Sequence, residues 1–216
     1  FYARYAHQIQ AKKSAKKELS PDEELKERRT HVRMALIDAI RGTTPAAKAL
    51  EIAKAFLDDL GSDSPDVEEL SGDLTDAVVR LSVLALHELK TRQAAASFIE
   101  ELMEPSLKVE RGQPLSQREG RQKSRMDKVF DSNRFLEVLT NLAAVESYLY
   151  SENADKRARA VGILEGAILG IKPGTQAMVN ATTYTAMWVE ANMRMADAYL
   201  LWPEARNVQT ARKHAK

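Results

Sequence analysis

The chain has 216 residues, of which 44% are hydrophobic and 29% charged, and its 32 Lys+Arg and 31 Asp+Glu give a formal net charge of +1. This balance is typical of a globular protein with a sizeable core, and it excludes a wholly disordered chain. The chain contains no cysteine, which excludes disulfides, thiolate metal sites and a cysteine nucleophile.

The first stretch of the sequence is strongly basic. Residues 1–17 hold five basic residues and no acid, and the sequence starts at Phe1 rather than at a methionine. This bias is typical of an organellar targeting region and favours a mitochondrial location, with a cytoplasmic location as the alternative. A basic arm of the mature protein explains the same residues. We therefore assign residues 1–19 to a basic N-terminal arm that carries Arg4, Lys12, Lys13, Lys16 and Lys17.

Charge is uneven along the chain, although the total nearly cancels. Residues 18–76 carry 15 acids and 7 bases, whereas residues 77–131 and residues 132–216 each carry 8 acids and 10 bases. Such a distribution suits contacts with several differently charged neighbours. It suits equally a chain whose basic arm folds back on its own acidic section.

Helix signals dominate the section over residues 20–103. Ser20 and Glu23 form a capping box around Pro21, which predicts a helix to about residue 41. A second helix follows over 44–61, then a short helical turn at 64–65. A long, almost wholly apolar helix should begin after residue 73 and continue to about residue 103. His87 falls on it, and we expect a hydrogen-bonded core histidine there.

Residues 104–122 favour a linker. They contain two prolines and two glycines, mixed charge and no apolar periodicity. We expect any domain boundary here, with a second helical section over 123–203 and a basic C-terminal tail over 204–216.

A stripe of small residues marks the second section. Ala154, Ala158, Gly162, Gly166 and Gly170 place a small residue at every fourth position. Each interior glycine costs about 1 kcal/mol relative to alanine, so we expect a second helix to pack closely along this stripe. That helix belongs either to this chain or to another subunit.

The next helix should supply the large residues that lie against the stripe. Its aromatic and methionine residues recur at spacings of three and four, and core packing explains them better than a ligand pocket does. The expected packing or interface residues are Gly162, Gly166, Gly170, Tyr184, Trp188, Met195 and Trp202.

The pattern as a whole predicts an all-α protein. No segment alternates convincingly as a strand, and no repeat with a period of 20–50 residues is present. We expect a helical bundle, or a short irregular helical stack, of about seven to nine helices.

Motifs that carry chemistry are missing from the sequence. His87-Glu88 begins like a zinc-protease signature, but the second histidine position holds Thr91. No Glu-x-x-His pair and no phosphate-binding loop occur, and paired carboxylates such as Glu100-Glu101 are expected on solvated helix faces. We therefore expect no catalytic residue, no metal site, no cofactor and no membrane span.

Three functions remain open. The leading hypothesis is a non-catalytic structural or assembly subunit of a larger complex, such as a mitochondrial accessory subunit of a respiratory or ATP-synthase complex or of a ribosome. The second is a helical RNA-binding module, in which the basic arm acts together with a second basic cluster. The third is a small-molecule binder or enzyme in the C-terminal helical hairpin. The second basic cluster comprises Arg118, Arg121, Lys123, Arg125 and Lys128.

Overall fold

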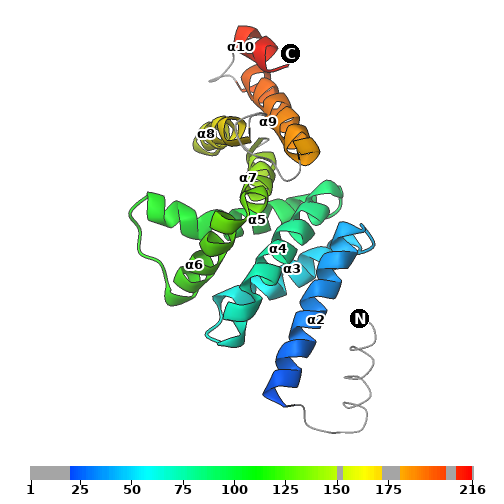
Figure 1. Ribbon diagram of the computed structural model, residues 1–216. Coiled ribbons are helices and arrows are strands. Elements are labelled where there is room, and N and C mark those ends of the chain that lie inside the picture. The colour runs from blue at the N-terminus through cyan, green and yellow to red at the C-terminus, as the bar shows by residue number, and fades with distance from the viewer. Residues whose placement is uncertain (1–19, 150–152, 172–180, 203–207, 216) are drawn as a thin grey trace. The chain divides into compact units, whose positions relative to one another are not determined.

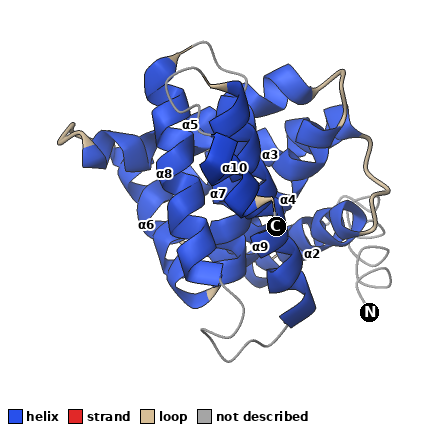
Figure 2. Ribbon diagram, turned by 90° about the horizontal axis from the view of Figure 1, so that it is seen from above, coloured by secondary structure: helices blue, strands red, loops and turns tan. Residues whose placement is uncertain are grey.

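The computed structural model describes residues 20–149, 153–171, 181–202 and 208–215. These residues form nine α-helices and no strand (Figures 1 and 2), which confirms the all-α prediction and the expected number of helices. The five basic residues assigned to the N-terminal arm lie outside the described residues. The chain divides into two compact units, with the boundary in the sequence between Ser132 and Asn133.

The described residues of the first unit form five helices, and α4 is central among them. Helices α2, α3, α5 and α6 all contact α4. Half of the 22 residues of α4 are buried, and these eleven residues lie between Val67 and Leu86. The bounds are α2 Pro21–Ile40, α3 Ala46–Gly61, α4 Asp66–His87, α5 Arg92–Glu110 and α6 Gln117–Ser132.

The start of α2 follows the predicted chemistry. The Ser20 hydroxyl accepts a hydrogen bond from the Glu23 backbone N–H, and the Glu23 carboxylate accepts one from the Ser20 backbone N–H. Pro21 occupies the first helical position, where its missing N–H leaves no bond unmade. The capping box therefore fixes where the helix begins.

The expected helix from 74 to 103 is two helices, because α4 ends at His87 and α5 begins at Arg92. The break is stabilised by side chains that take the place of backbone donors. The Thr91 hydroxyl donates to the Ala85 carbonyl, and Arg92 Nε donates to the Leu86 carbonyl. Carbonyls at the end of α4 thus find partners without a further helical turn.

The segment over 104–122 differs from the expected linker. Helix α5 continues through Pro105 to Glu110, α6 starts at Gln117, and only a short turn separates them. Helix α6 packs against α3 and α4, so the chain after this turn still belongs to the first unit. The boundary between the units lies ten residues beyond the expected linker, after Ser132.

In the second unit the described residues form four helices around a core of their own. In this unit α8 contacts α7 and α9, and α10 contacts α9. Its most buried side chains include Leu136 on α7, Leu164 on α8 and Met195 on α9. The bounds are α7 Arg134–Leu149, α8 Ala154–Ile171, α9 Ala181–Leu201 and α10 Val208–His214.

Candidate functional site

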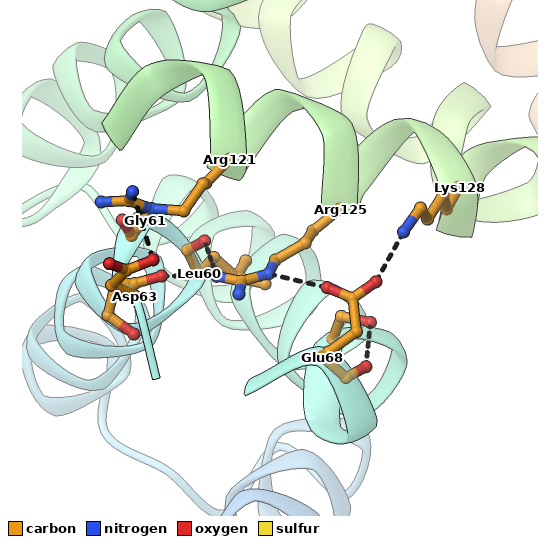
Figure 3. A network of polar contacts seen from close by, with 9 residues as sticks. Leu60, Gly61, Asp63, Glu68, Arg121, Arg125 and Lys128 are labelled. Atoms are coloured by element: carbon orange, nitrogen blue, oxygen red, sulfur yellow. Dashed lines mark hydrogen bonds and ion pairs between the residues drawn. The ribbon is translucent and has the colours of Figure 1, made fainter. Parts of the chain in front are cut away.

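A network of charged side chains joins α6 to the turn between α3 and α4 (Figure 3), and Arg125 is its centre. The Arg125 side chain is only 9% exposed. Its Nη1 donates to the carbonyls of Leu60 and Ser62, each at 2.8 Å, and its Nε donates to Glu68 at 3.2 Å. One guanidinium therefore satisfies carbonyls at the C-terminus of α3 and a carboxylate near the N-terminus of α4, where each charge is favourable.

Two neighbours on α6 extend the network along the same turn. Lys128 donates to the other oxygen of Glu68, and Arg121 donates to the Gly61 carbonyl while contacting Asp63 at 3.4 Å. The bonds from Lys128 and then Arg125 lower the pKa of Glu68 below its usual value. The carboxylate is therefore held in its charged form.

Arg118 adds a further contact to α3. Its guanidinium pairs with Asp58, and its side chain crosses Gly61. A Cβ at residue 61 would lie 2.6 Å from Arg118 Cγ, so this crossing depends on glycine. Gly61, the last residue of α3, is thus also a packing position.

Helix α2 supplies arginines to the acids of the same two helices. Arg28 pairs with Asp59 of α3 at 2.6 Å, and Arg33 pairs with Asp73 of α4 at 2.7 Å. The acidic section at 18–76 is therefore neutralised in part by its own α2 and in part by α6. The expected alternative, in which the basic N-terminal arm folds back on this acidic section, lies outside the described residues.

This arrangement weakens the case for RNA binding through the second basic cluster. Phosphate contacts require cations whose charge is not already compensated by acids. Instead, every member of the cluster pairs with an acid of the same chain, and two of them also bind backbone carbonyls. The pairs are Arg118–Asp58, Arg121–Asp63, Lys123–Asp127, Arg125–Glu68 and Lys128–Glu68.

In the second unit, the glycine stripe lies on the solvent side of α8. Gly162 and Gly166 are exposed, and a Cβ built on either meets nothing within 4 Å. The helix buries Ala160, Leu164 and Ala167 instead. The expected close approach of a helix of this chain is therefore absent at these two glycines within the described residues. The surroundings of Gly170 are outside the description.

The large residues expected on the following helix differ in how deeply they are buried. Met195 is fully buried and Trp202 nearly so, while Trp188 is half-buried and packs against the cluster of Val138 and Met187. Tyr184 lies on α9, and its side chain is outside the described part of the structure. These tryptophans and methionines pack in the core of the second unit, but not onto Gly162 and Gly166.

Helix α9 also leaves large apolar side chains in water, which sequence reasoning missed. Val189, Met193 and Leu200 are 46%, 56% and 49% exposed. With 3.6 residues per turn, these positions fall within about 40° of one another on the helix. We call these three residues the α9 stripe. In the sequence, these three residues are four and seven positions apart, and this helical spacing is the signal that could have indicated the stripe.

The remaining candidates carry little chemistry. His87 is exposed at the end of α4, so the expectation of a core histidine was wrong, because the helix ends there. Among the described residues no group of three or more His, Asp or Glu is placed to hold a metal ion. None of the described helices has both the length and the apolar character needed to cross a membrane.

Comparisons of the chain with protein-family models, with curated proteins and with solved structures found no match.

Proposed function

We propose that this chain is a non-catalytic structural or assembly subunit of a larger multiprotein complex. The observation that carries the proposal is the α9 stripe. Exposed apolar surface costs roughly 25 cal/mol per Å² in water, and a row of large apolar side chains on one helix face is typical of a contact surface. A partner with an apolar face would bury Val189, Met193 and Leu200 together.

The exposed glycines on α8 support the same proposal. Gly162 and Gly166 face solvent with bare backbone. Their cost in a helix interior, about 1 kcal/mol each, is not offset by packing within the described chain. Close packing of a helix from another subunit is the alternative that offsets it.

The compartment and the kind of complex follow from the sequence rather than from the fold. The basic, acid-free composition of residues 1–17 supports a mitochondrial accessory subunit. The ion pairs of the second basic cluster favour protein partners over RNA. RNA binding is therefore the alternative outcome of the experiment below.

Sedimentation of the native protein from its source, with and without RNase, tests the proposal. We expect co-sedimentation with a large, RNase-resistant particle, whose other components mass spectrometry identifies. A collapse to a small species on RNase treatment would replace the proposal with the RNA-binding alternative. A monomer under both conditions would contradict it.

Matched variants locate the contact surface. Met193→Asp should remove the protein from the particle, because a charge in the α9 stripe has to be desolvated on binding. Val109→Asp, on an exposed apolar residue of α5, should leave co-sedimentation unchanged. Gly166→Leu should weaken association without unfolding the chain. A Gly166→Leu protein that assembles like the wild type would remove the glycines from the interface.

A further inference from the structure

A cleft of about 530 Å³ lies between α5 and the start of α6. Its α5 wall carries the carboxylates of Glu100, Glu101 and Glu104, and its α6 wall carries Glu119 and Gln122. Arg118 is the one cation among the lining residues. The cleft is therefore strongly acidic.

The nearby cations compensate only part of this charge. Arg118 pairs with Asp58 on α3, and Lys108 pairs with Glu119. The Lys108 bond, together with the backbone N–H and hydroxyl of Ser116, lowers the pKa of Glu119 to about 2.

The α5 carboxylates are less well compensated. Arg111 is 3.9 Å from Glu104, a long ion pair between half-exposed groups. No ion pair joins Glu101 to a cation within the described residues. Negative charge thus remains on the α5 wall.

An independent observation points to a ligand in the cleft. Gln122 lines it and is only 6% exposed, yet no hydrogen bond joins its carboxamide to any residue that the structure describes. The carboxamide atoms are not among the sealed polar atoms of the described residues, so they are reached from the cleft that Gln122 lines. Its oxygen is available to a donor that enters the cleft.

Pro105 interrupts the hydrogen bonding of α5 beside the cleft. It lies inside α5 and lines the cleft. Because proline has no N–H, the carbonyl of Glu101, one turn earlier, lacks its normal helical donor. The side chains that line the cleft thus offer carboxylate and carboxamide oxygens, which accept hydrogen bonds.

We propose that this cleft binds the side chain of an arginine in a basic peptide segment of a partner protein. A guanidinium has five N–H donors, no acceptor and a fixed positive charge, which matches a cleft of acceptors with excess negative charge. A metal ion fits less well, because among the described residues no three acidic or histidine side chains are placed to ligate one. The identity of the occupant as a partner's segment rests on the proposed function.

NMR titration of the ¹⁵N-labelled full-length chain tests the inference. The probe is the capped peptide Ac-Gly-Gly-Arg-Gly-Gly-amide, and its control carries the neutral isostere citrulline in place of arginine. We expect the arginine peptide to give a saturable shift of the Gln122 side-chain amide, with other shifts confined to residues 97–105 and 116–122. The citrulline peptide should bind much more weakly. No shift at Gln122, or equal shifts with the two peptides, would overturn the proposal.

Protein variants distinguish binding in the cleft from nonspecific attraction of the basic peptide to acidic residues. Glu101→Gln/Glu104→Gln should weaken binding roughly tenfold, because two charge pairs are lost. Glu24→Gln/Glu51→Gln makes the same change in net charge on exposed residues of α2 and α3, and it should leave affinity within about twofold. Equal losses in the two double variants would overturn the proposal.

Gln122→Met tests the carboxamide with little change in side-chain volume. It should weaken binding of the arginine peptide without lowering the Tm, and an unchanged affinity would remove Gln122 from the site. All these measurements use the isolated chain. A chain that sediments as a monomer would therefore contradict the proposed function. The NMR titration would still decide whether the cleft binds arginine.

Discussion

The two units of the molecule use their surfaces in opposite ways. In the first, charged side chains of α2 and α6 pair with acids of α3 and α4, so these charges are compensated within the chain. In the second, α9 leaves Val189, Met193 and Leu200 in water, and α8 leaves two glycines bare. The comparison teaches that the basic residues of α6 belong to the fold, whereas part of the apolar surface of α9 is not packed against any described residue.

The largest expected effect concerns Arg125. Arg125→Ala should lower the free energy of unfolding by about 2–4 kcal/mol, because it leaves the Leu60 and Ser62 carbonyls without their donor and removes one of the two donors of Glu68. Urea unfolding followed by circular dichroism measures the change. Lys128→Ala is the control, and it should cost less than about 1 kcal/mol, since its side chain is 63% exposed. Equal effects would mean that the α6 contacts are surface ion pairs only.

The pH dependence of the stability of the first unit also tests whether its ion pairs stabilise the fold. The pKa of Glu119 is lowered to about 2 from its usual 4.5. Its contribution to stability is therefore complete above about pH 4.5 and is lost as the pH falls toward 2. Urea midpoints of the wild type and of Glu119→Gln should differ at pH 6 and converge by pH 2. A difference independent of pH would show that the Lys108–Glu119 pair does not stabilise the fold.

A smaller effect of opposite sign is expected on α8. Gly166→Ala should raise the free energy of unfolding of the isolated chain by about 0.5–1 kcal/mol, because the added methyl meets open space and alanine favours the helix. Thermal unfolding measures it. The matched change Gly61→Ala should destabilise the chain, because the new Cβ meets the Arg118 side chain. A destabilising Gly166→Ala would indicate close packing within the chain.

The smallest effect is a weaker attachment of α10 at acidic pH. His214 Nδ1 lies 2.9 Å from Asn192 Oδ1, and its ring stacks on Tyr199. Burial, and to a lesser degree Lys213, lowers its pKa below 6.5, with Glu165 opposing. The contribution to stability is thus present above pH 6.5 and lost below it. Hydrogen exchange, corrected for the intrinsic pH effect, should show lower protection of α10 at pH 5.5 than at 7.5, and His214→Gln should abolish the difference.

The sequence was informative wherever structure depends on near neighbours. The capping box at Ser20 and Glu23 lies within one helical turn, so its chemistry alone fixes the start of α2. The expected linker differed because its composition does not show that α6 finds partners some 60 residues earlier in the chain. The exposed side of α8 was missed for a related reason. The spacing of Gly162 and Gly166 indicates a helix face without side chains. It does not show which other segment packs against that face.

The long sequence separation of the Arg125 contacts also has a consequence for synthesis. Leu60 precedes Arg125 by 65 residues, so α3 and the start of α4 leave the ribosome well before the arginine that binds them. During that interval the acidic turn carries its charge without the cations of α6. A nascent chain interrupted before Gln117 would hold the helical segments of the first unit without the bonds that close it. Completion of this unit is therefore tied to the emergence of its last helix.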